Sequence, residues 1–229
     1  MRNSPSSIMI FAAGLGTRMG DLTADRPKPM INIAGKPLID HALSLVNDAD
    51  IGKAVVNLHY LPDALTRHLQ GQNILFSDET DRLLETGGGF KKAADMLGSD
   101  AVFTMNSDAI WKGQNPLKIV AETWNAERMD ALLLLVPQDR AHGHEAQHDF
   151  DLTDHGHVKR PGPFRYTGVQ IIKPQRVTEV QDDVFSLNLV WNRLIAKGKL
   201  YGCIYEGHWC DVGNPSGIHI AESLLASDV

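Results

Sequence analysis

Residues 8–35 read IMIFAAGLGTRMGDLTADRPKPMINIAG, and the character of the chain changes abruptly at Gly14. The apolar run of residues 8–13 is short and is closed by Gly14 and Gly16, a pattern typical of a buried parallel strand that leads into a loop. In open α/β sheets, ligands bind at the carboxyl edge of the strands, where such loops gather. The stretch therefore predicts an α/β protein with a ligand site at its first loop.

The residues of this loop are suited to phosphate. Gly14 and Gly16 allow a close backbone approach, so that consecutive N–H groups can converge on anionic oxygens. Arg18 can chelate phosphate oxygens in a fork, and Lys28, between two prolines, supplies a compact charge. The dinucleotide fingerprint fails because no glycine stands three residues after Gly16, and the Gly-Lys-Ser/Thr ending of the phosphate loop is absent. We therefore interpret the stretch as a cradle for a nucleoside triphosphate, against the alternative of an ordinary Gly/Pro turn.

Composition limits the classes of function. The 229 residues suit one α/β domain with an ample core, and the formal charge of −6 argues against general binding of nucleic acid or acidic membranes. Residues 14–36 nevertheless carry four basic side chains against two acidic ones, which favours a small anionic ligand. The two cysteines, Cys203 and Cys210, have no metal-like spacing and predict reduced thiols in a cytoplasmic protein. We find neither a signal-peptide pattern nor an apolar run approaching the ~20 residues that span a bilayer.

Strand-like and helix-like segments alternate after the first loop. Strands are expected at residues 54–58, 74–76, 101–105 and 131–136, and helices from residue 37 and at residues 62–69, 86–97 and 117–124. Four repeats of strand and helix predict a parallel sheet with right-handed crossovers. The run ALLLLV at 131–136 is continuously apolar, and we expect it to be the most central strand.

The alternation breaks after residue 137. Residues 138–163 are polar, rich in histidine and interrupted by glycine and proline, with a hairpin expected around residues 154–156. The elements expected beyond them are a strand at 164–172, a helix at 188–196, a strand at 200–205 and a helix from 215 to about 225, capped by Asn214. No repeat or linker interrupts the chain. Residues 1–229 are therefore predicted to form one domain, with residues 1–7 as a disordered or extended tail.

Two aspartates follow strand-like runs far apart in the sequence. Asp108 stands in Asn106-Ser107-Asp108, directly after the strand at 101–105, and Asp211 stands in the run WCDVG. Each alone is as compatible with a turn or helix-capping role as with chemistry. Two carboxylates brought to one sheet edge would suit Mg²⁺, which takes hard oxygen ligands and neutralises charge during phosphoryl transfer. Asp108 and Asp211 are therefore candidate magnesium ligands.

Several motifs together resemble one family. AAGLGTRM is followed by PKPM and GKPLI, then by LLETGGG at 83–89, MNSDAIW, HDF at 148–150 and GHWCDVG at 207–213. Over essentially the whole chain, these motifs resemble the sugar-1-phosphate nucleotidylyltransferases. The resemblance implies the nucleotide-diphospho-sugar transferase fold, a Rossmann-like three-layer α/β sandwich with a mostly parallel mixed sheet. It also implies a nucleotide-binding half at 8–136 and a sugar-binding half at 137–229.

The resemblance assigns roles to individual residues. Nucleotide contacts are implied for Ala12, Ala13, Gly14, Gly16, Thr17, Arg18, Lys28, Gly87 and Gly88. Asn106, Asp149 and Gly168 match sugar-side positions, Asp108 and Asp211 match the metal ligands, and Arg18, Lys28 and Asp108 match the catalytic residues. The Glu-Lys-Pro motif of many relatives is replaced by Lys159-Arg160-Pro161. Lys159 is therefore a shifted candidate for the sugar-phosphate lysine, with a solvated surface lysine as the alternative.

The resemblance implies a single displacement. An oxygen of the sugar phosphate attacks the α-phosphorus of the nucleotide and pyrophosphate leaves with Mg²⁺, so no Ser/His/Asp relay is needed and the protein supplies positioning and charge stabilisation. Within the family, the motifs are most similar to the branch that joins UTP and N-acetylmuramate 1-phosphate in peptidoglycan recycling. The expected partners are these small molecules, without nucleic acid or membrane, in a monomer or weak homodimer because the extensions of longer relatives are absent.

Other functions remain open from the residues. Guanylyl transfer to mannose or heptose 1-phosphate is the alternative within the family. A catalytically silent sugar-nucleotide-binding protein is disfavoured because Arg18, Lys28, Asp108 and Asp211 are all present. A nicotinamide-dependent reductase is disfavoured because the dinucleotide fingerprint and a Tyr-x-x-x-Lys pair are lacking.

Five histidines lie close together in the sequence. They are His142, His144, His148, His155 and His157. His142-x-His144 could ligate zinc, but no cysteine or glutamate completes a zinc-protease spacing. We therefore expect the segment to form a polar wall of the sugar pocket rather than a metal site.

Overall fold

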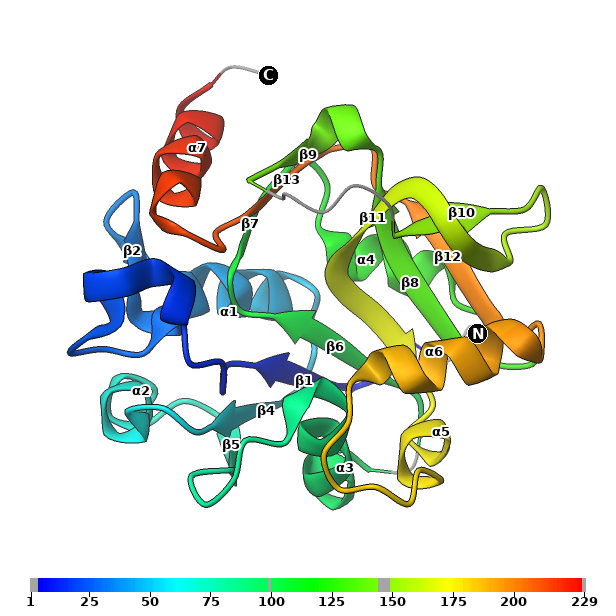
Figure 1. Ribbon diagram of the computed structural model, residues 1–229, viewed down its shortest axis with the longest axis horizontal. Coiled ribbons are helices and arrows are strands. Elements are labelled where there is room, and N and C mark those ends of the chain that lie inside the picture. Colours follow the sequence, from blue (N-terminus) through cyan, green and yellow to red (C-terminus); the bar gives the residue numbers. More distant parts are fainter. Residues whose placement is uncertain (1–3, 99, 144–148, 228–229) are drawn as a thin grey trace.

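The computed structural model describes residues 4–98, 100–143 and 149–227, and one large sheet runs through it (Figure 1). The strand order is β12-β8-β11-β6-β1-β4-β5, with β10 paired to β11. The strands are β1 (Ser7–Phe11), β4 (Lys53–Leu58), β5 (Ile74–Asp78), β6 (Val102–Asn106), β8 (Ala131–Val136), β10 (Phe150–Leu152), β11 (Val158–Ile172) and β12 (Leu200–Ile204). Along this order only β11 runs antiparallel to its neighbours, which confirms the expected mostly parallel mixed sheet.

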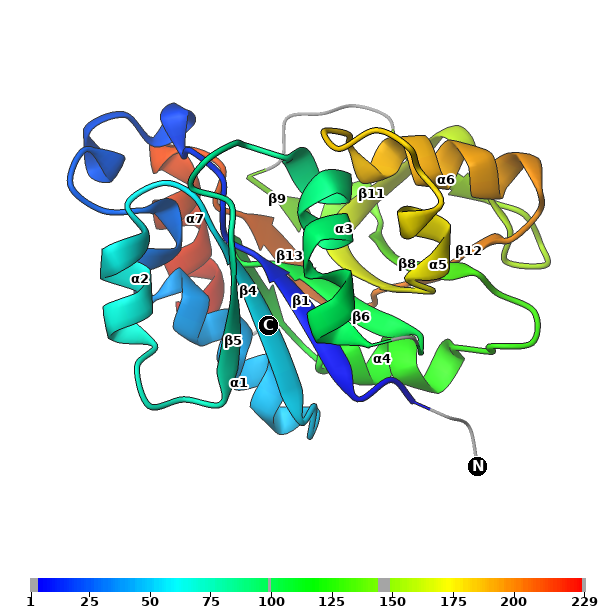
Figure 2. The same ribbon diagram turned by 90° about the horizontal axis from the view of Figure 1, so that it is seen from below.

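Helices cover both faces of the sheet because alternate strand residues point to opposite sides. Ile8 and Ile10 of β1 pack with α1, α2 and α4, whereas Met9 packs with α3, α5 and α6. Figures 1 and 2 show α1 and α3 on opposite sides of β1. The helices are α1 (Leu38–Asp48), α2 (Pro62–His68), α3 (Glu85–Leu97), α4 (Pro116–Thr123), α5 (Gln175–Thr178), α6 (Leu187–Ala196) and α7 (Pro215–Ala226). The three-layer sandwich expected from the sequence is confirmed.

The expected position of the ALLLLV strand is wrong. β8 lies second from one edge of the sheet, beside β12, and β6 occupies the middle. Every residue of β8 is nevertheless buried. Its continuous apolar character follows from helices on both faces and strands on both sides, and these conditions do not require a central place.

Most expected element boundaries agree with the structure to within one or two residues. The side chain of Asn214 accepts a hydrogen bond from the Gly217 N–H at 3.1 Å, which confirms the cap of α7. β1 already begins at Ser7, a residue assigned to the tail by the sequence, and residues 1–3 lie outside the described part. Within the described ranges, no helix has the length and apolar character needed to cross a membrane.

The hairpin expected around residues 154–156 is present between β10 and β11. The Thr153 N–H donates to the His157 carbonyl at 2.9 Å. β11 starts at Val158, six residues earlier than the strand expected at 164–172. The early part pairs only with β10, and four residues bulge from the ladder because Asp151 pairs with Lys159 while Phe150 pairs with Phe164.

A second, three-stranded sheet was not predicted from the sequence. It consists of β7 (Ala109–Lys112), β13 (His208–Asp211) and β9 (Ala141–His142), in the order β7-β13-β9. β7 continues the chain directly after β6, so this sheet stands beyond the carboxyl end of the main sheet (Figure 1). Helix α7 packs against it through Ala221 and Leu224. Two short strands, β2 (Asn32–Ile33) and β3 (Lys36–Pro37), form a separate hairpin.

Candidate active site

A cavity of about 290 Å³ opens where β1 and β6 end. The 3-10 helix η2 (Lys28–Met30) forms one side and the start of α3 forms another. The cavity is lined by Phe11, Ala12, Ala13, Gly14, Lys28, Pro29, Asn57, Glu79, Leu83, Glu85, Thr86, Asn106, Ser107 and Asp108. The sequence predicts a ligand site at this edge. Residues of the glycine loop and of the Asn106-Ser107-Asp108 motif both line this cavity.

Asn57 fixes the first turn of the loop after β1. Its Oδ1 accepts the Ala12 N–H at 2.7 Å and the Ala13 N–H at 3.3 Å, and its Nδ2 donates to Glu79 Oε1 at 2.8 Å. The N–H groups of Ala12 and Ala13 therefore already donate to Asn57 and do not point to a ligand. A ligand in the cavity meets their other atoms and the neighbouring Gly14.

Glu79 is a buried carboxylate that the sequence analysis missed. Only 1% of the residue is exposed, and burial raises the pKa of its carboxyl group. Its Oε2 has no hydrogen-bond partner in the part of the chain that the structure describes. A Cβ on Gly89 of α3 would lie 2.6 Å from Oε1, so a glycine is needed there. The signal that could have found Glu79 is its place directly after β5, on the same edge as the first loop.

The glycine turn leads into the 3-10 helix η1 (Thr17–Thr23). Gly16 has a φ of +67°, which favours glycine, and a Cβ there would lie 3.1 Å from Lys28 Cβ. A Cβ on Gly14 would meet no atom within 4 Å, so this side of the turn is open. Thr17 and Arg18 begin η1 and are exposed.

Lys28 and Asp108 are in direct contact. Lys28 Nζ lies 2.5 Å from Asp108 Oδ2, and the lysine is 8% exposed. A buried ammonium group needs a counter-charge, which this carboxylate provides. This ion pair brings the lysine of the predicted phosphate cradle into contact with the aspartate that follows β6.

Asp108 and Asp211 come together across two neighbouring strands. Asp211 pairs with Ala109 in the antiparallel β7–β13 ladder, and the Val212 N–H donates to the Asp108 carbonyl at 2.9 Å. Both aspartates line a second cavity of about 330 Å³. A Cβ on Gly213 would lie 3.0 Å from Asp211 Oδ2 and 3.2 Å from Arg18 Nη1, so the guanidinium also reaches this point.

The donor set fits a hard divalent cation. Asp108 and Asp211 supply carboxylate oxygens, which Mg²⁺ prefers. Among the described residues, no group of three or more His, Cys, Asp or Glu side chains could hold a metal ion. A two-carboxylate set accords with the habit of Mg²⁺ of taking its remaining ligands from phosphates and water.

The second cavity extends from the aspartate pair toward the sugar-side candidates. It is lined by Phe11, Arg18, Thr86, Asn106, Asp108, Asp149, Phe150, Arg160, Tyr166, Ser186, Leu187, Asn188, Trp191, Trp209 and Asp211. Asp149 Oδ2 accepts the Tyr166 N–H at 3.1 Å. Gly168 has a φ of +86°, and a Cβ there would lie 2.8 Å from the Asn106 side chain, so this glycine makes room for Asn106.

Lys159 does not reach either of these cavities. Its Nζ lies 3.0 Å from Asp151 Oδ2, and its side chain is 54% exposed. This is the solvated surface lysine that the sequence left as the alternative. Arg160, the next residue, lines the second cavity instead, and sequence reasoning missed it.

Gly87 and Gly88 pack against the segment before α6. Both N–H groups donate to the Phe185 carbonyl, at 2.8 and 3.1 Å. A Cβ on Gly87 would lie 2.3 Å from the Phe185 ring, and one on Gly88 would lie 2.0 Å from the Asp183 carbonyl oxygen. The structure thus gives these glycines a packing reason, and their contact with the base stays a prediction.

The described histidines of this group, His142, His155 and His157, do not line the two cavities beside Asp108. His142 contacts His208 at 3.1 Å in the small sheet, and the His157 ring lies 4.3 Å from that of Tyr201. Neither contact points into the two cavities, and a role of the group in binding sugar stays a prediction. His144 and His148 lie outside the described residues.

Comparisons with known proteins agree with this geometry. The family model described as "Nucleotidyl transferase" matches residues 7–144. N-acetylmuramate alpha-1-phosphate uridylyltransferase of Caulobacter vibrioides is 40% identical, over 99% of this chain and 99% of its own. Mannose-1-phosphate guanyltransferase of Saccharomyces cerevisiae is 28% identical, over 90% of this chain and 61% of its own. The crystal structure of HddC from Yersinia pseudotuberculosis superposes with a TM-score of 0.75 at 22% identity, over 96% of this chain and 99% of its own.

An α/β sandwich with a glycine turn, two basic residues and two aspartates at one sheet edge is the arrangement expected of a transferase that acts on phosphate groups. The chain belongs to the nucleotidyl transferase family, in the class of sugar-1-phosphate nucleotidyltransferases, as its motifs predicted.

Proposed function

We propose that this protein joins UTP and N-acetylmuramate 1-phosphate to give UDP-N-acetylmuramate and pyrophosphate, a step of peptidoglycan recycling. Two full-length relatives carry the name of this activity, at 40% and 30% identity. The observation that carries the reaction type is the meeting of Lys28, Arg18, Asp108 and Asp211 around connected cavities. Guanylyl transfer to mannose 1-phosphate is the second candidate, because guanyltransferases match at 28% identity.

The nucleotide occupies the first cavity and the sugar phosphate the second. This division follows the chain, because the first cavity is lined only by residues from 11 to 108, whereas the second adds residues from 149 to 211. It supports a nucleotide-binding half at residues 8–136 and a sugar-binding half at 137–229. Ala12, Ala13, Gly14, Gly16 and Thr17 face the nucleotide. Asn106, Asp149 and Gly168 face the sugar.

Catalysis rests on positioning and on charge. A phosphate monoester is nucleophilic near neutral pH, and its oxygen bonds to the α-phosphorus while the bond to pyrophosphate breaks. Lys28 and Arg18 direct positive charge at the phosphates, where negative charge accumulates in the transition state. Because these donors are held by the fold, little reorganisation accompanies the reaction.

Asp108 and Asp211 would hold Mg²⁺, which when bound neutralises phosphate charge and orients the triphosphate. Lys28 fixes the orientation of the Asp108 carboxylate through their 2.5 Å contact. Arg18 lies beside Asp211 and serves the same end of the site.

A matrix of nucleoside triphosphates against sugar 1-phosphates, scored by pyrophosphate release, tests the function. We expect UTP with N-acetylmuramate 1-phosphate to give the highest kcat/KM. A preference for GTP with mannose or heptose 1-phosphate would favour the second candidate. Failure of every pair to release pyrophosphate, with binding retained, would indicate a silent sugar-nucleotide-binding protein.

The proposal extends to assembly and location. We expect a monomer or weak homodimer, which light scattering after size-exclusion chromatography measures directly. Nucleoside triphosphate substrates favour the cytoplasm. Free thiols at Cys203 and Cys210 accord with that location, and burial raises the pKa of each to about 12, so neither is a reactive thiolate.

A further inference from the structure

One arginine stands at the sugar end of the second cavity, away from the cations of the phosphate cradle. We propose that Arg160 binds the carboxylate of the sugar's lactyl ether, so that the site selects sugar 1-phosphates with an anionic substituent. The inference rests on the proposed function and names the residue that would read the feature that distinguishes N-acetylmuramate from N-acetylglucosamine.

The backbone places Arg160 toward the cavity. Phe150 pairs with Phe164 and Asp151 pairs with Lys159, so residues 160–163 leave the β10–β11 ladder as a bulge. Bulges re-aim side chains beside binding sites. Lys159 remains in the ladder and pairs with Asp151, whereas Arg160 lines the cavity.

Aromatic rings and neutral amides fix the orientation of the Arg160 guanidinium without neutralising its charge. The guanidinium carbon lies 4.3 Å from the Phe150 ring centroid and 5.9 Å from that of Trp191. Its Nη2 donates to Asn188 Oδ1 at 2.5 Å and its Nη1 to Asn192 Oδ1 at 3.1 Å, and both acceptors are neutral amides. The charge of Asp149 acts on Arg160 electrostatically, but none of the ion pairs found among the described residues includes Arg160. These two bonds use two of the five guanidinium N–H donors, so Arg160 keeps its charge and further donors at the cavity wall.

A carboxylate is the group that this arrangement fits. The planar guanidinium matches a carboxylate with two parallel hydrogen bonds, and aromatic stacking on Phe150 leaves its edge available. Lys28 and Arg18 would bind the phosphates, at the end of the site that holds Asp108 and Asp211, so Arg160 is not needed for phosphate. A neutral hexose would offer only hydroxyl groups to Arg160. N-acetylmuramate offers a lactyl carboxylate, on the part of the sugar away from the anomeric phosphate.

Steady-state kinetics on two sugar phosphates test the inference. N-acetylmuramate 1-phosphate and N-acetylglucosamine 1-phosphate are compared at saturating UTP for the wild type, Arg160→Gln and Arg160→Lys. Arg193→Gln is the matched control, because Arg193 is an exposed arginine of α6, the helix that Arg160 contacts, and lies outside the cavity lining. We expect Arg160→Gln to lower kcat/KM for the muramate about 10- to 100-fold, the range for loss of a charge-assisted hydrogen bond. We expect a change of less than about threefold for N-acetylglucosamine 1-phosphate, with Arg160→Lys intermediate on the muramate.

Each other outcome has a distinct meaning. Equal losses on both sugars would show that Arg160 binds the shared phosphate and would overturn the inference. An unchanged preference in Arg160→Gln would overturn it as well, while leaving the proposed function in place. If the wild type itself shows no preference for the muramate, the proposed function fails first. Thermal unfolding of all variants separates these results from misfolding, and Arg160→Lys keeps the test decisive if Arg160→Gln is unstable.

Discussion

At the scale of single residues, the site depends on a buried lysine and two half-buried aspartates that lie close together. Lys28 has little exposure and contacts Asp108, and Asp108 neighbours Asp211 through the β7–β13 ladder. Removing one member leaves another without its partner, which is costly in a poorly solvated place. Substitutions here therefore test chemistry and stability together.

Asp108→Asn keeps the shape of the side chain and removes its charge. We expect pyrophosphate release to fall at least about a thousandfold, in keeping with loss of a pre-organised electrostatic group, while the fold persists. Pyrophosphate assays at saturating Mg²⁺ and circular dichroism measure the two effects. Near-normal turnover at saturating Mg²⁺ would remove Asp108 from the mechanism.

Lys28→Ala removes the ammonium group from the cradle. We expect kcat to fall by a factor that corresponds to about 3 kcal/mol of lost transition-state stabilisation, as for the removal of one oxyanion donor. Initial rates over a range of UTP concentrations separate kcat from KM. A rise in KM at constant kcat would mean that Lys28 binds substrate and transition state equally.

Glu79→Gln tests the buried carboxylate that lines the first cavity. Burial raises the pKa of Glu79 in the folded protein, so this side chain favours folding below its unfolded pKa, and that stability is lost as the pH rises through the folded value. We expect the stability of the glutamine variant relative to wild type to improve between about pH 4.5 and pH 8. Urea unfolding at both pH values measures this, and a relative stability independent of pH would contradict it.

At the scale of elements, the start of α3 depends on glycines for close packing. The LETGGG run looks like a poor helix, because glycine costs about 1 kcal/mol relative to alanine in a helix interior. In the structure, Gly88 faces the Asp183 carbonyl and Gly89 faces Glu79. These contacts explain why α3 forms with three consecutive glycines, and they join the nucleotide side of the molecule to the segment before α6.

Gly88→Ala should destabilise the protein in spite of better helix propensity. The new Cβ would lie 2.0 Å from a backbone oxygen, so α3 or residues 183–185 must shift. We expect a loss of about 2 kcal/mol in the free energy of unfolding, as for overpacked interiors. Urea unfolding measures it, and Asp95→Ala, at an exposed position of α3, is the control expected within about 0.5 kcal/mol of wild type. A stabilised Gly88→Ala variant would contradict this account.

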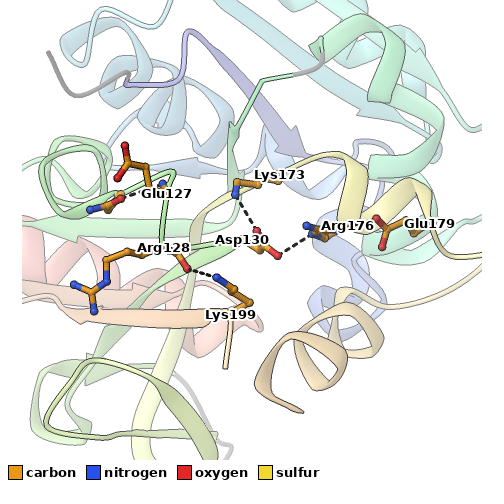
Figure 3. Close-up of polar contacts among 8 residues, drawn as sticks. Glu127, Arg128, Asp130, Lys173, Arg176, Glu179 and Lys199 are labelled. Atoms are coloured by element: carbon orange, nitrogen blue, oxygen red, sulfur yellow. Dashed lines mark hydrogen bonds and ion pairs between the residues drawn. The ribbon is translucent and has the colours of Figure 1, made fainter. Parts of the chain in front are cut away.

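At the scale of the whole molecule, a charged cluster ties the elements together at the edge opposite the site. Asp130 precedes β8 and accepts from Lys173 Nζ at 2.9 Å and Arg176 Nε at 2.8 Å (Figure 3). Its N–H donates to the Lys199 carbonyl at 3.0 Å. The cluster therefore links β8, the end of β11, α5 and the start of β12.

Asp130→Asn should lower stability without altering catalysis. Burial alone would raise the pKa of Asp130, but hydrogen bonds from Lys173 and Arg176 outweigh it and lower the pKa. The stabilisation is present above the unfolded value near 3.8 and is lost as the pH falls through the folded value. We expect a loss of about 2 kcal/mol near pH 7 and a smaller loss toward pH 3, with kcat/KM unchanged. Urea unfolding at both pH values measures it, and an equal loss at each would rule out the charge as the cause.

Local patterns were enough to predict much of this protein. The strand–helix alternation, the hairpin at 154–156 and the Asn214 cap depend on periodicity, turn chemistry and capping within a few residues of each other. The glycine turn with Arg18 and Lys28, and the two aspartates after strands, also followed from order along the chain. These features placed the candidate site at the carboxyl edge of the sheet.

Tertiary structure alone decided the features that depend on pairing between distant segments. β8 sits near an edge because β11 and β12 enter the sheet around it. Asn57 and Glu79 become part of the first cavity only because β4 and β5 lie beside β1. Arg160 rather than Lys159 lines the second cavity because the β10–β11 register makes residues 160–163 bulge. Periodicity and capping depend on neighbouring residues, so the sequence alone determines them. Strand order and register depend on which distant segments bury their apolar faces together, and no short stretch of sequence carries that information.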